Sequence, residues 1–505
     1  MDIDSCRKKT NHKIMLPAAV NFGLPPEVIQ NIASFIEKDH NLMNFMLSCW
    51  GVYHSTIYPQ SGVWRHRFTQ FFDLPPGKSG KELQVSYMKR KLIQRYFLSR
   101  NVTLQAILSN CTRSPKSRNL LQQAGTFFSL GKSKDEVEIL KMMQNLTLES
   151  FESPNGSCLK SKNIDFLESI CESTNLLNCV LQHSPKFKIS PLLAVMQLVL
   201  FHKTLTLPAK SSNHHSFNAS QKVAYQDPVK VPIFRGRKKN KVNLDWALHI
   251  SNFFSYHIKS TAESTLWPYF NELQDWEKPK AWDKKLEDAT SILGKNWLGS
   301  YTYLDGPEDI SAFRDTSAFN EDCDHQFIDN INEASDGPFQ ASLEKAPVKF
   351  TTLSFTFPDT FVKSFPDAFD AHINPQPHES LDKKYAAKRF TATGKDGENT
   401  FLCDGYIHGL PPQENIPGWQ RISFVKYYME DLIREEIALE DDTLDNSSAS
   451  MTVASGFAWA YEGVVLPSKK IILGRWWRCE SEDNEFDDGQ YLGPCIFWQI
   501  EDEPK

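Results

Sequence analysis

Apolar residues recur at helical spacing in a stretch close to the start of the chain. Val28, Ile32 and Phe35 are separated by four and three residues, and Ile29 and Ile36 lie beside them. Residues at these intervals share one face of an α-helix. The stretch therefore predicts a helix whose apolar stripe is wide for its short length.

Signals for the start of this helix stand just before the stripe. Pro25 and Pro26 are placed for the first turn, where a missing N–H group removes no hydrogen bond. Glu27 complements the partial positive charge of a helix N-terminus. Residues 1–20 before it read as a flexible leader.

Two further apolar clusters follow at similar spacing. Leu42, Phe45 and Met46 form one, and Trp64 and Phe68 form the other. Together with the first stripe they predict three short helices within residues 21–72. So small a unit buries too little apolar surface to be very stable alone. It needs a partner, which is either the rest of the chain or another protein.

Residues 80–282 are predicted to form a mostly helical domain with a polar loop near 209–241. Ser190 and Pro191 are placed as the N-cap and the first residue of one helix. Four segments have an apolar period of 3.6 residues: "KELQVSYMKRKLIQRYFL", "KDEVEILKMMQNL", "IDFLESICESTNLLNCVLQ" and "SPLLAVMQLVLFHKTL".

The pattern changes in residues 283–505, where short apolar runs alternate with Gly, Pro and Asp. Leu353, Phe355 and Phe357 alternate with Thr and Ser, which is the period of a half-buried strand. Many short strands with turn residues between them predict an antiparallel β-barrel or β-sandwich. The whole chain is therefore expected to be an α+β multidomain protein.

Composition narrows the class of protein. With 505 residues, the chain is too long for one core, and roughly two to four domains are expected. Its net charge of −6 argues against a dedicated nucleic-acid partner. One basic run, from Arg235 to Lys241, stands apart. It is a nuclear address, a phosphate-binding patch or a solvated loop, and the sequence alone leaves these alternatives open.

Cysteine usage bears on the compartment. The ten cysteines are scattered without a CxxC pair, and no secretory signal or membrane-spanning apolar run is evident. Free thiols in a reducing compartment fit this pattern. We therefore expect no membrane association and a location in the cytoplasm, the nucleus or both.

Catalytic motifs are not evident. The sequence lacks G-x-S-x-G, the Walker A pattern and H-E-x-x-H. Cys323 and His325 are close in sequence, but a catalytic pair normally comes from separate elements. His214 and His215 have no Cys or carboxylate cluster to complete a metal site. We expect no catalytic residues, metal or cofactor, and hence a protein that is not an enzyme.

The opening stretch "LPPEVIQNIASFI … LMNFMLSCWGVYH … VWRHRF" resembles an F-box. The family pattern opens with Leu-Pro-x-Glu and an apolar residue, which Leu24, Pro25, Glu27 and Val28 match. Apolar positions of the first helix, a Leu-containing second helix and a Trp near the third helix follow. One departure is that "FMLSCW" lacks the Arg that many members carry before the aromatic residue of the second helix.

The resemblance implies that a three-helix F-box docks on a Skp1-like adaptor, and through it on the cullin and RING subunits of a ubiquitin ligase. Apolar side chains would fill a groove on the adaptor. The alternative is that they pack on the chain's own next domain. The adaptor-binding residues implied by the resemblance are Leu24, Pro25, Glu27, Val28, Ile29, Ile32, Phe35, Ile36, Leu42, Phe45 and Trp64.

The last segments, "FLCDGYIHGLPPQENIPGWQRISFVKY", "WAYEGVVLPSKKIILGRWW" and "GPCIFW", are similar to the C-terminal region of fungal F-box proteins. They resemble more faintly the substrate-recognition β-barrel of an animal cyclin-binding F-box protein. The implied function is that of a substrate receptor, which holds an unidentified target protein near the ubiquitin-charged enzyme. A scaffold that binds the adaptor outside the ligase, or a barrel that binds a small molecule, are the alternatives.

Arg475, Trp476 and Trp477 are the candidate target-binding residues of this region. Neighbouring residues of a strand point to opposite faces, so one Trp is free to line a groove or the barrel mouth beside Arg475. Arg with Trp suits an acidic or phosphorylated peptide, or a terminal carboxyl group. The alternative is structural: Trp476 in the core, Trp477 under the helical domain and Arg475 paired with a Glu.

Overall fold

The structure is a computed structural model that describes residues 23–57, 61–98, 134–151, 161–171, 190–206, 217–226, 228, 230–261, 266–302, 351–356, 383–396, 399–428, 458–479 and 492–502. The chain divides into two compact units. The first unit comprises residues 1–96 and 149–166, and the second comprises 97–148 and 167–505. The expected leader at 1–20 lies outside the described residues.

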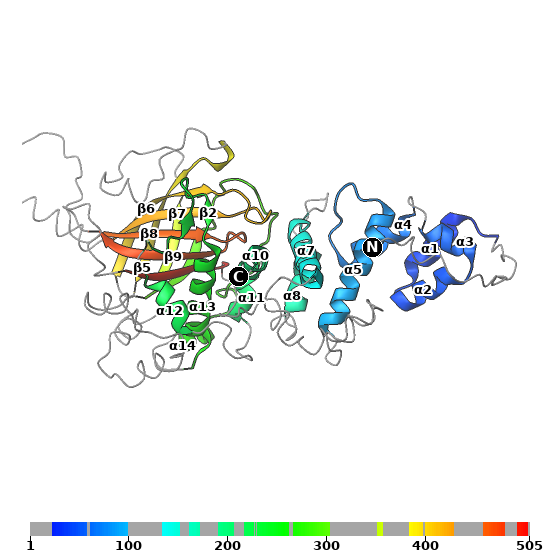
Figure 1. The fold of residues 1–505 in the computed structure, drawn as a ribbon, viewed down its shortest axis with the longest axis horizontal. Coiled ribbons are helices and arrows are strands. Elements are labelled where there is room, and N and C mark those ends of the chain that lie inside the picture. The colour runs from blue at the N-terminus through cyan, green and yellow to red at the C-terminus, as the bar shows by residue number, and fades with distance from the viewer. Residues whose placement is uncertain are drawn as a thin grey trace, which may run out of the picture. The chain divides into compact units, whose positions relative to one another are not determined.

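The first unit begins with short helices, which Figure 1 draws in blue. The described residues between 21 and 72 form four helices rather than the expected three, because the second apolar cluster is followed by a separate helix. Ser48 donates both its N–H group and its hydroxyl to the Phe45 carbonyl (3.1 and 2.7 Å), and this tight turn ends the second helix. The helices are α1 (Pro26–Phe35), α2 (Asp39–Leu47), α3 (Trp50–Ile57) and α4 (Gly62–Phe71).

The remainder of the first unit is held by two charged residues, the buried Arg90 and the half-buried Asp73. It consists of α5 (Gly80–Leu98, in this unit as far as residue 96) and the first half of α8 (Lys162–Cys171). The Asp73 carboxylate accepts hydrogen bonds from the Lys162 N–H group (3.1 Å) and the Ser161 hydroxyl at the start of α8. Arg90 on α5 pairs with Glu149, and its guanidinium lies 4.8 Å from the centre of the Phe72 ring. These contacts join the two chain segments of the unit.

The second unit is built on an antiparallel β-barrel, which confirms the prediction of a β-rich C-terminal region and favours a barrel over a sandwich. In the described residues β10 pairs with both β9 and β3, and this double pairing closes the ring in the order β10-β3-β4-β5-β6-β7-β8-β9. The strands are β3 (Asn296–Tyr301), β4 (Thr351–Thr356), β5 (Lys388–Asp396), β6 (Asn399–Gly409), β7 (Gln420–Tyr428), β8 (Ala458–Val465), β9 (Ile471–Cys479) and β10 (Leu492–Gln499).

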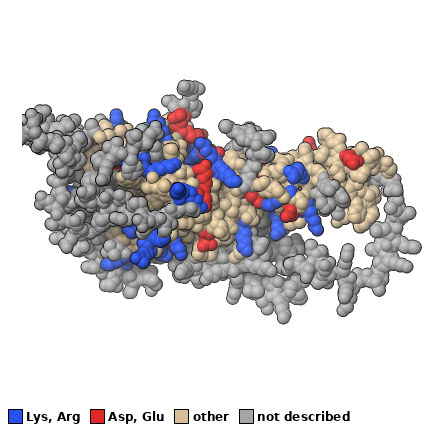
Figure 2. Space-filling model, turned by 90° about the horizontal axis from the view of Figure 1, so that it is seen from above, with Lys and Arg blue, Asp and Glu red and all other residues tan. Residues whose placement is uncertain are grey.

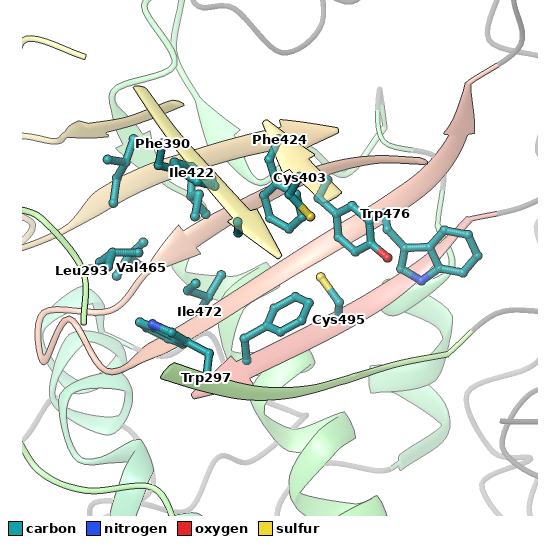
Figure 3. Close-up of a cluster of buried hydrophobic side chains, with 14 of the residues drawn as sticks. Leu293, Trp297, Phe390, Cys403, Ile422, Phe424, Val465, Ile472, Trp476 and Cys495 are labelled. Carbon is teal, nitrogen blue, oxygen red and sulfur yellow. The ribbon is translucent and has the colours of Figure 1, made fainter. Parts of the chain in front are cut away.

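Alternate residues of these strands fill the barrel, as the period-2 geometry of a strand requires. Figure 3 shows Trp297, Phe424, Trp476 and Cys495 pointing into the shared interior. The Phe424 ring stacks on the Tyr461 ring with centroids 4.6 Å apart. The buried cluster consists of Leu293, Trp297, Phe390, Ala392, Phe401, Cys403, Ile407, Ile422, Phe424, Tyr461, Val465, Ile472, Trp476, Cys495 and Phe497.

Helices pack beside the barrel within the second unit, so the expected boundary at 282/283 does not separate compact units. α13 contacts β9, and the Tyr225 hydroxyl lies 2.7 Å from the Thr302 hydroxyl at the end of β3. The described helices of this unit, besides the second half of α8, are α7 (Lys134–Leu148), α10 (Pro191–Val199), α11 (Phe201–Thr206), α12 (Phe217–Ala224), α13 (Leu244–Lys259), α14 (Trp267–Glu272) and the 3-10 turn η4 (Lys383–Tyr385).

Two local predictions for the helical region have different outcomes. The Ser190 hydroxyl accepts a hydrogen bond from the Leu193 N–H group (3.3 Å) and Pro191 begins α10, so the expected cap is confirmed. The region near 209–241 is not entirely a loop, because its described part contains α12 and the hairpin of β1 (Phe234–Arg235) and β2 (Lys241–Val242). No helix within the described ranges is both long and apolar enough to cross a membrane.

Candidate functional site

The outer face of α1 carries a line of exposed apolar side chains. Leu24, Val28 and Ile32 are 41–43% exposed, and Phe35 is 78% exposed. Spacings of four and three residues place Val28, Ile32 and Phe35 along one side of the helix, and Leu24 lies two residues before its start. Ile29, on the other side of the helix, is buried where α1 packs against α3 and α4. The wide apolar stripe is therefore divided into an inner face that holds the unit together and an outer face whose large apolar side chains are exposed.

Two more large apolar residues are exposed where α2 ends and α3 begins. Leu47 is 69% exposed and Trp50 is 64% exposed. The Trp50 ring is in contact with the His54 ring, with centroids 4.1 Å apart. The sequence pattern did not indicate Leu47 or Trp50 as site residues, because both lie outside the predicted apolar stripes. In Figure 2 the part of the surface formed by these first helices shows few charged side chains.

The residues implied by the F-box resemblance separate into three groups. Leu24, Pro25, Glu27, Val28, Ile32 and Phe35 are exposed, and Ile36 and Phe45 are half-buried. Ile29, Leu42 and Trp64 are buried in the core of the unit, so they support the outer face and do not form it. The Trp64 ring lies 6.1 Å from the Tyr87 ring of α5, which explains why this Trp faces inward.

Arg67 on α4 fixes the end of α1. Its guanidinium donates to the Ile36 carbonyl (3.1 Å) and the Glu37 carbonyl, which are backbone acceptors left free where the helix ends. It also pairs with Asp39 at 2.7 Å. Burial acts to raise the pKa of Asp39, but hydrogen bonds from Arg67 and the Tyr87 hydroxyl (2.8 Å) outweigh it and hold that pKa below its usual value. The α1–α2 turn is therefore held in one place, which stabilises the orientation of the exposed face.

A shallow open groove of about 540 Å³ lies at the surface where α1 and α4 meet. Its walls mix one exposed residue of the outer face, Val28, with polar side chains of both helices. The lining residues are Glu27, Val28, Gln30, Asn31, Ser34, Gly62, Val63 and His66. The groove offers hydrogen-bonding groups at the edge of the apolar face, which is the arrangement of an interface rim.

The three candidate target-binding residues of the barrel do not form a joint surface. Trp476 points inward, is buried and donates its indole N–H group to the Thr302 carbonyl (3.1 Å). Arg475 points outward but is buried beneath the helices, where it donates to the Val231 carbonyl (3.3 Å) and lies over the Trp246 ring of α13. Trp477 is half-buried on the outer face. Arg475 and Trp476 point to opposite faces of the strand, as predicted. The helices cover Arg475, however, so its side chain is not accessible to a target protein.

A polar cluster lies near one end of the described strands of the barrel. The Lys426 ammonium is 2.9 Å from the Asp396 carboxylate, which also accepts hydrogen bonds from the hydroxyls of Tyr428 (3.0 Å) and Tyr301. The same ammonium lies 4.3 Å from the centre of the Phe401 ring. Together with the aromatic cluster of the interior, these side chains occupy space inside the barrel, which argues against the alternative of a barrel that holds a small molecule.

Chemistry-bearing residues do not gather elsewhere in the part of the chain that the structure describes. No group of three or more His, Cys, Asp or Glu side chains is arranged there to hold a metal ion. Cys323, His325, His214 and His215 lie outside the described residues. The exposed apolar face of α1 is the candidate site that the described residues offer.

Comparisons of the chain with protein-family models, with curated proteins and with solved structures find no match.

Proposed function

We propose that the chain is the substrate-recognition subunit of an SCF (Skp1-cullin-F-box) ubiquitin ligase, acting in the cytoplasm or the nucleus without catalytic residues of its own. The first unit would bind the Skp1-like adaptor, and through it the cullin and RING subunits. The second unit would hold a target protein. The catalytic gain would come from proximity, because a bound target presents its lysines at a high effective concentration.

The exposed apolar line Leu24–Val28–Ile32–Phe35 is the observation that carries this proposal. Burying one such side chain contributes up to about 1.5–3 kcal/mol, and a few anchors usually dominate a helix-in-groove interface. A single-chain protein rarely exposes a contiguous line of this kind without a binding role. The position of the line on an element that resembles the first F-box helix supports a Skp1-like adaptor as the partner.

The test is complex formation with a recombinant Skp1-like adaptor, measured by size-exclusion chromatography and calorimetry. The variant Val28→Ser/Ile32→Ser/Phe35→Ser changes only exposed positions, so its helical circular dichroism should equal that of the wild type. We expect the wild type to form a one-to-one complex and the variant to lose it. A matched control is Val85→Ser/Met88→Ser on α5, which removes exposed apolar residues of the same unit away from α1. The control should bind normally.

Equal binding by the wild type and the α1 variant, or no binding by either, would contradict adaptor docking through this face. The ligase itself is tested separately, by adding the cullin and RING subunits and measuring ubiquitin transfer to co-purified proteins. An adaptor complex that excludes the cullin would support the scaffold alternative. No specific observation on the second unit favours that alternative.

A further inference from the structure

The basic run noted in the sequence forms a defined hairpin in the second unit. β1 and β2 pair in antiparallel register, with Phe234 opposite Val242 and Arg235 opposite Lys241. Phe234 and Val242 are buried, and the Phe234 ring lies 5.3 Å from the Arg421 guanidinium on β7. The hairpin is therefore anchored through one side and presents its other side to solvent.

Backbone contacts make the hairpin rigid. The Asn243 N–H group donates to the Ile233 carbonyl (2.8 Å), which closes the base, and the Lys239 N–H group donates to the Gly236 carbonyl (2.9 Å), which closes the turn. The Val242 N–H group also donates to the Gln413 side chain (3.3 Å) in the loop between β6 and β7. Lys239 adopts a left-handed backbone with φ of 47°, which a side-chain-bearing residue does only where neighbouring contacts enforce it.

All five cations of the run are exposed: Arg235, Arg237, Lys238, Lys239 and Lys241. The run contains no acidic residue. Arg235, Arg237, Lys239 and Lys241 form no ion pair with any acidic side chain that the structure describes. The positive charge of these four residues is thus held in one place on the hairpin.

The cross-strand pair of Arg235 and Lys241 is the decisive feature. Directly opposite residues of an antiparallel pair have Cβ atoms about 4.5–5.5 Å apart, and like charges there destabilise the pairing. A dianion placed between the two side chains would convert this repulsion into two charge-assisted hydrogen bonds. A phosphoryl group carries a charge close to −2 at neutral pH and three acceptor oxygens, which matches the pair.

We propose that the β1–β2 hairpin binds a phosphorylated peptide segment, with the phosphoryl group between Arg235 and Lys241 and further acidic groups against the cations of the turn. The inference goes beyond adaptor docking, which concerns the first unit, and it stands or falls independently of it. If both hold, the phosphorylated segment belongs to the target protein.

Other polyanions fit the hairpin less well. A nucleic acid is a long polyanion that the net charge of −6 repels, and binding of its single strands relies on exposed aromatic side chains for stacking. The aromatic residue of the hairpin, Phe234, is buried. A membrane surface is gripped by apolar side chains inserted next to basic ones, but Ile233, Phe234 and Val242 all face inward.

The experiment uses the full chain, immobilised, and two short degenerate peptide libraries that differ only in a central phosphothreonine or threonine. We expect the phosphorylated library to be retained at least about tenfold better, since one charge-assisted contact is equivalent to roughly that factor. Arg235→Gln/Lys241→Gln should abolish the preference. The control Lys81→Gln/Lys89→Gln removes the same charge from exposed positions of α5 and should retain it.

Thermal unfolding separates loss of the site from loss of the fold. Because the substitution removes a repulsive pair, Arg235→Gln/Lys241→Gln should melt at the same temperature as the wild type or higher. Equal retention of the two libraries, or equal loss in the α5 control, would overturn the proposal. So would retention of a single-stranded oligonucleotide or of phosphatidylcholine–phosphatidylserine vesicles in place of the phosphorylated library.

Discussion

The Lys426 ammonium is paired with the Asp396 carboxylate at 2.9 Å inside the β-barrel, with both side chains largely removed from solvent. Burial by itself would favour the neutral acid, but Lys426 and the surrounding hydroxyl donors outweigh that effect and keep the pKa of Asp396 below its usual value. The environment therefore favours the carboxylate form of Asp396, and the pair belongs to the core.

Breaking this pair is expected to be costly. Lys426→Met leaves a carboxylate in the barrel without its counter-ion, and we expect it to lower the free energy of unfolding of the second unit by about 3–5 kcal/mol. Urea unfolding followed by tryptophan fluorescence measures the change. The double variant Lys426→Met/Asp396→Asn should recover part of the loss, because no uncompensated charge remains.

The control for that experiment is the exposed pair of Lys384 and Asp288, which are 2.7 Å apart at the surface of the same unit. Lys384→Met should leave the unfolding midpoint unchanged within error, because solvent screens such a pair. If the two lysine substitutions had equal effects, the Lys426–Asp396 pair would not be a core interaction.

Acidification should destabilise the second unit through two buried histidines. Burial lowers the pKa of His257 and of His408 to about 3, whereas an unfolded histidine titrates near 6.5. Between these values the unfolded chain binds more protons than the folded chain, so stability is full above pH 6.5 and falls as the pH decreases. At pH 5 each histidine should cost about 2 kcal/mol relative to pH 7.

His257 provides the specific test of that pH dependence. Its ring lies among Phe217, Phe253 and Tyr256, and its Nδ1 atom has no hydrogen-bond partner within the described structure. His257→Phe keeps an aromatic ring in place and removes the titrating group. Chemical unfolding at pH 7 and pH 5 should show a smaller difference for the variant, and an unchanged difference would exclude His257 as a source.

Gly405 on β6 should not tolerate a side chain. A Cβ atom there would lie 2.4 Å from the Cβ atom of Phe424 and 2.8 Å from the ring of Phe390, both in the barrel interior. Gly405→Ala is expected to destabilise the second unit by about 1–3 kcal/mol through overpacking. Gly62→Ala on α4 meets no atom within 4 Å and should be neutral or slightly stabilising, since Ala favours a helix. Thermal denaturation of both variants checks the contrast.

Arg67 should be required both for the stability of the first unit and for adaptor binding. Arg67→Lys preserves the charge but lacks the fork that reaches two carbonyl groups and Asp39 together. We expect a loss of about 2–3 kcal/mol in the free energy of unfolding and weaker binding of the adaptor. Binding that stays at the wild-type level while stability falls would show that the outer face of α1 does not depend on this anchor.

Local signals predicted the local elements well. The apolar spacing of Val28, Ile32 and Phe35 predicted α1, and Ser190 with Pro191 predicted the start of α10, because these patterns act within one or two turns of the chain. The same spacing did not tell which side of α1 is covered. Ile29 and Val28 are equally apolar neighbours, and only packing on α3 and α4 makes the first buried and the second exposed.

Features that depend on contacts between distant parts of the chain could not be predicted from the sequence. The burial of Arg475 requires α13, which precedes it by more than two hundred residues and is visible only in the packed unit. The hairpin of β1 and β2 was not predicted either. Its two buried residues, Phe234 and Val242, are separated by a run of charged residues, and such a run predicts a solvated loop. The helix α1 was predictable although its exposed face was not, and the basic hairpin became a candidate only through its register.

The first unit is discontinuous in sequence, because the chain leaves it after residue 96 and returns for residues 149–166. A fragment cut at residue 96 would lack Glu149, Ser161 and Lys162. Buried Arg90 would lose its ion pair with Glu149, and Asp73 would lose the hydrogen bonds from Ser161 and Lys162. A single protease cut between residues 97 and 148 would not release the first unit either, because these contacts hold its two segments together. The first unit is therefore not a detachable N-terminal module, and a truncated version made to test the proposed adaptor binding should run through residue 166.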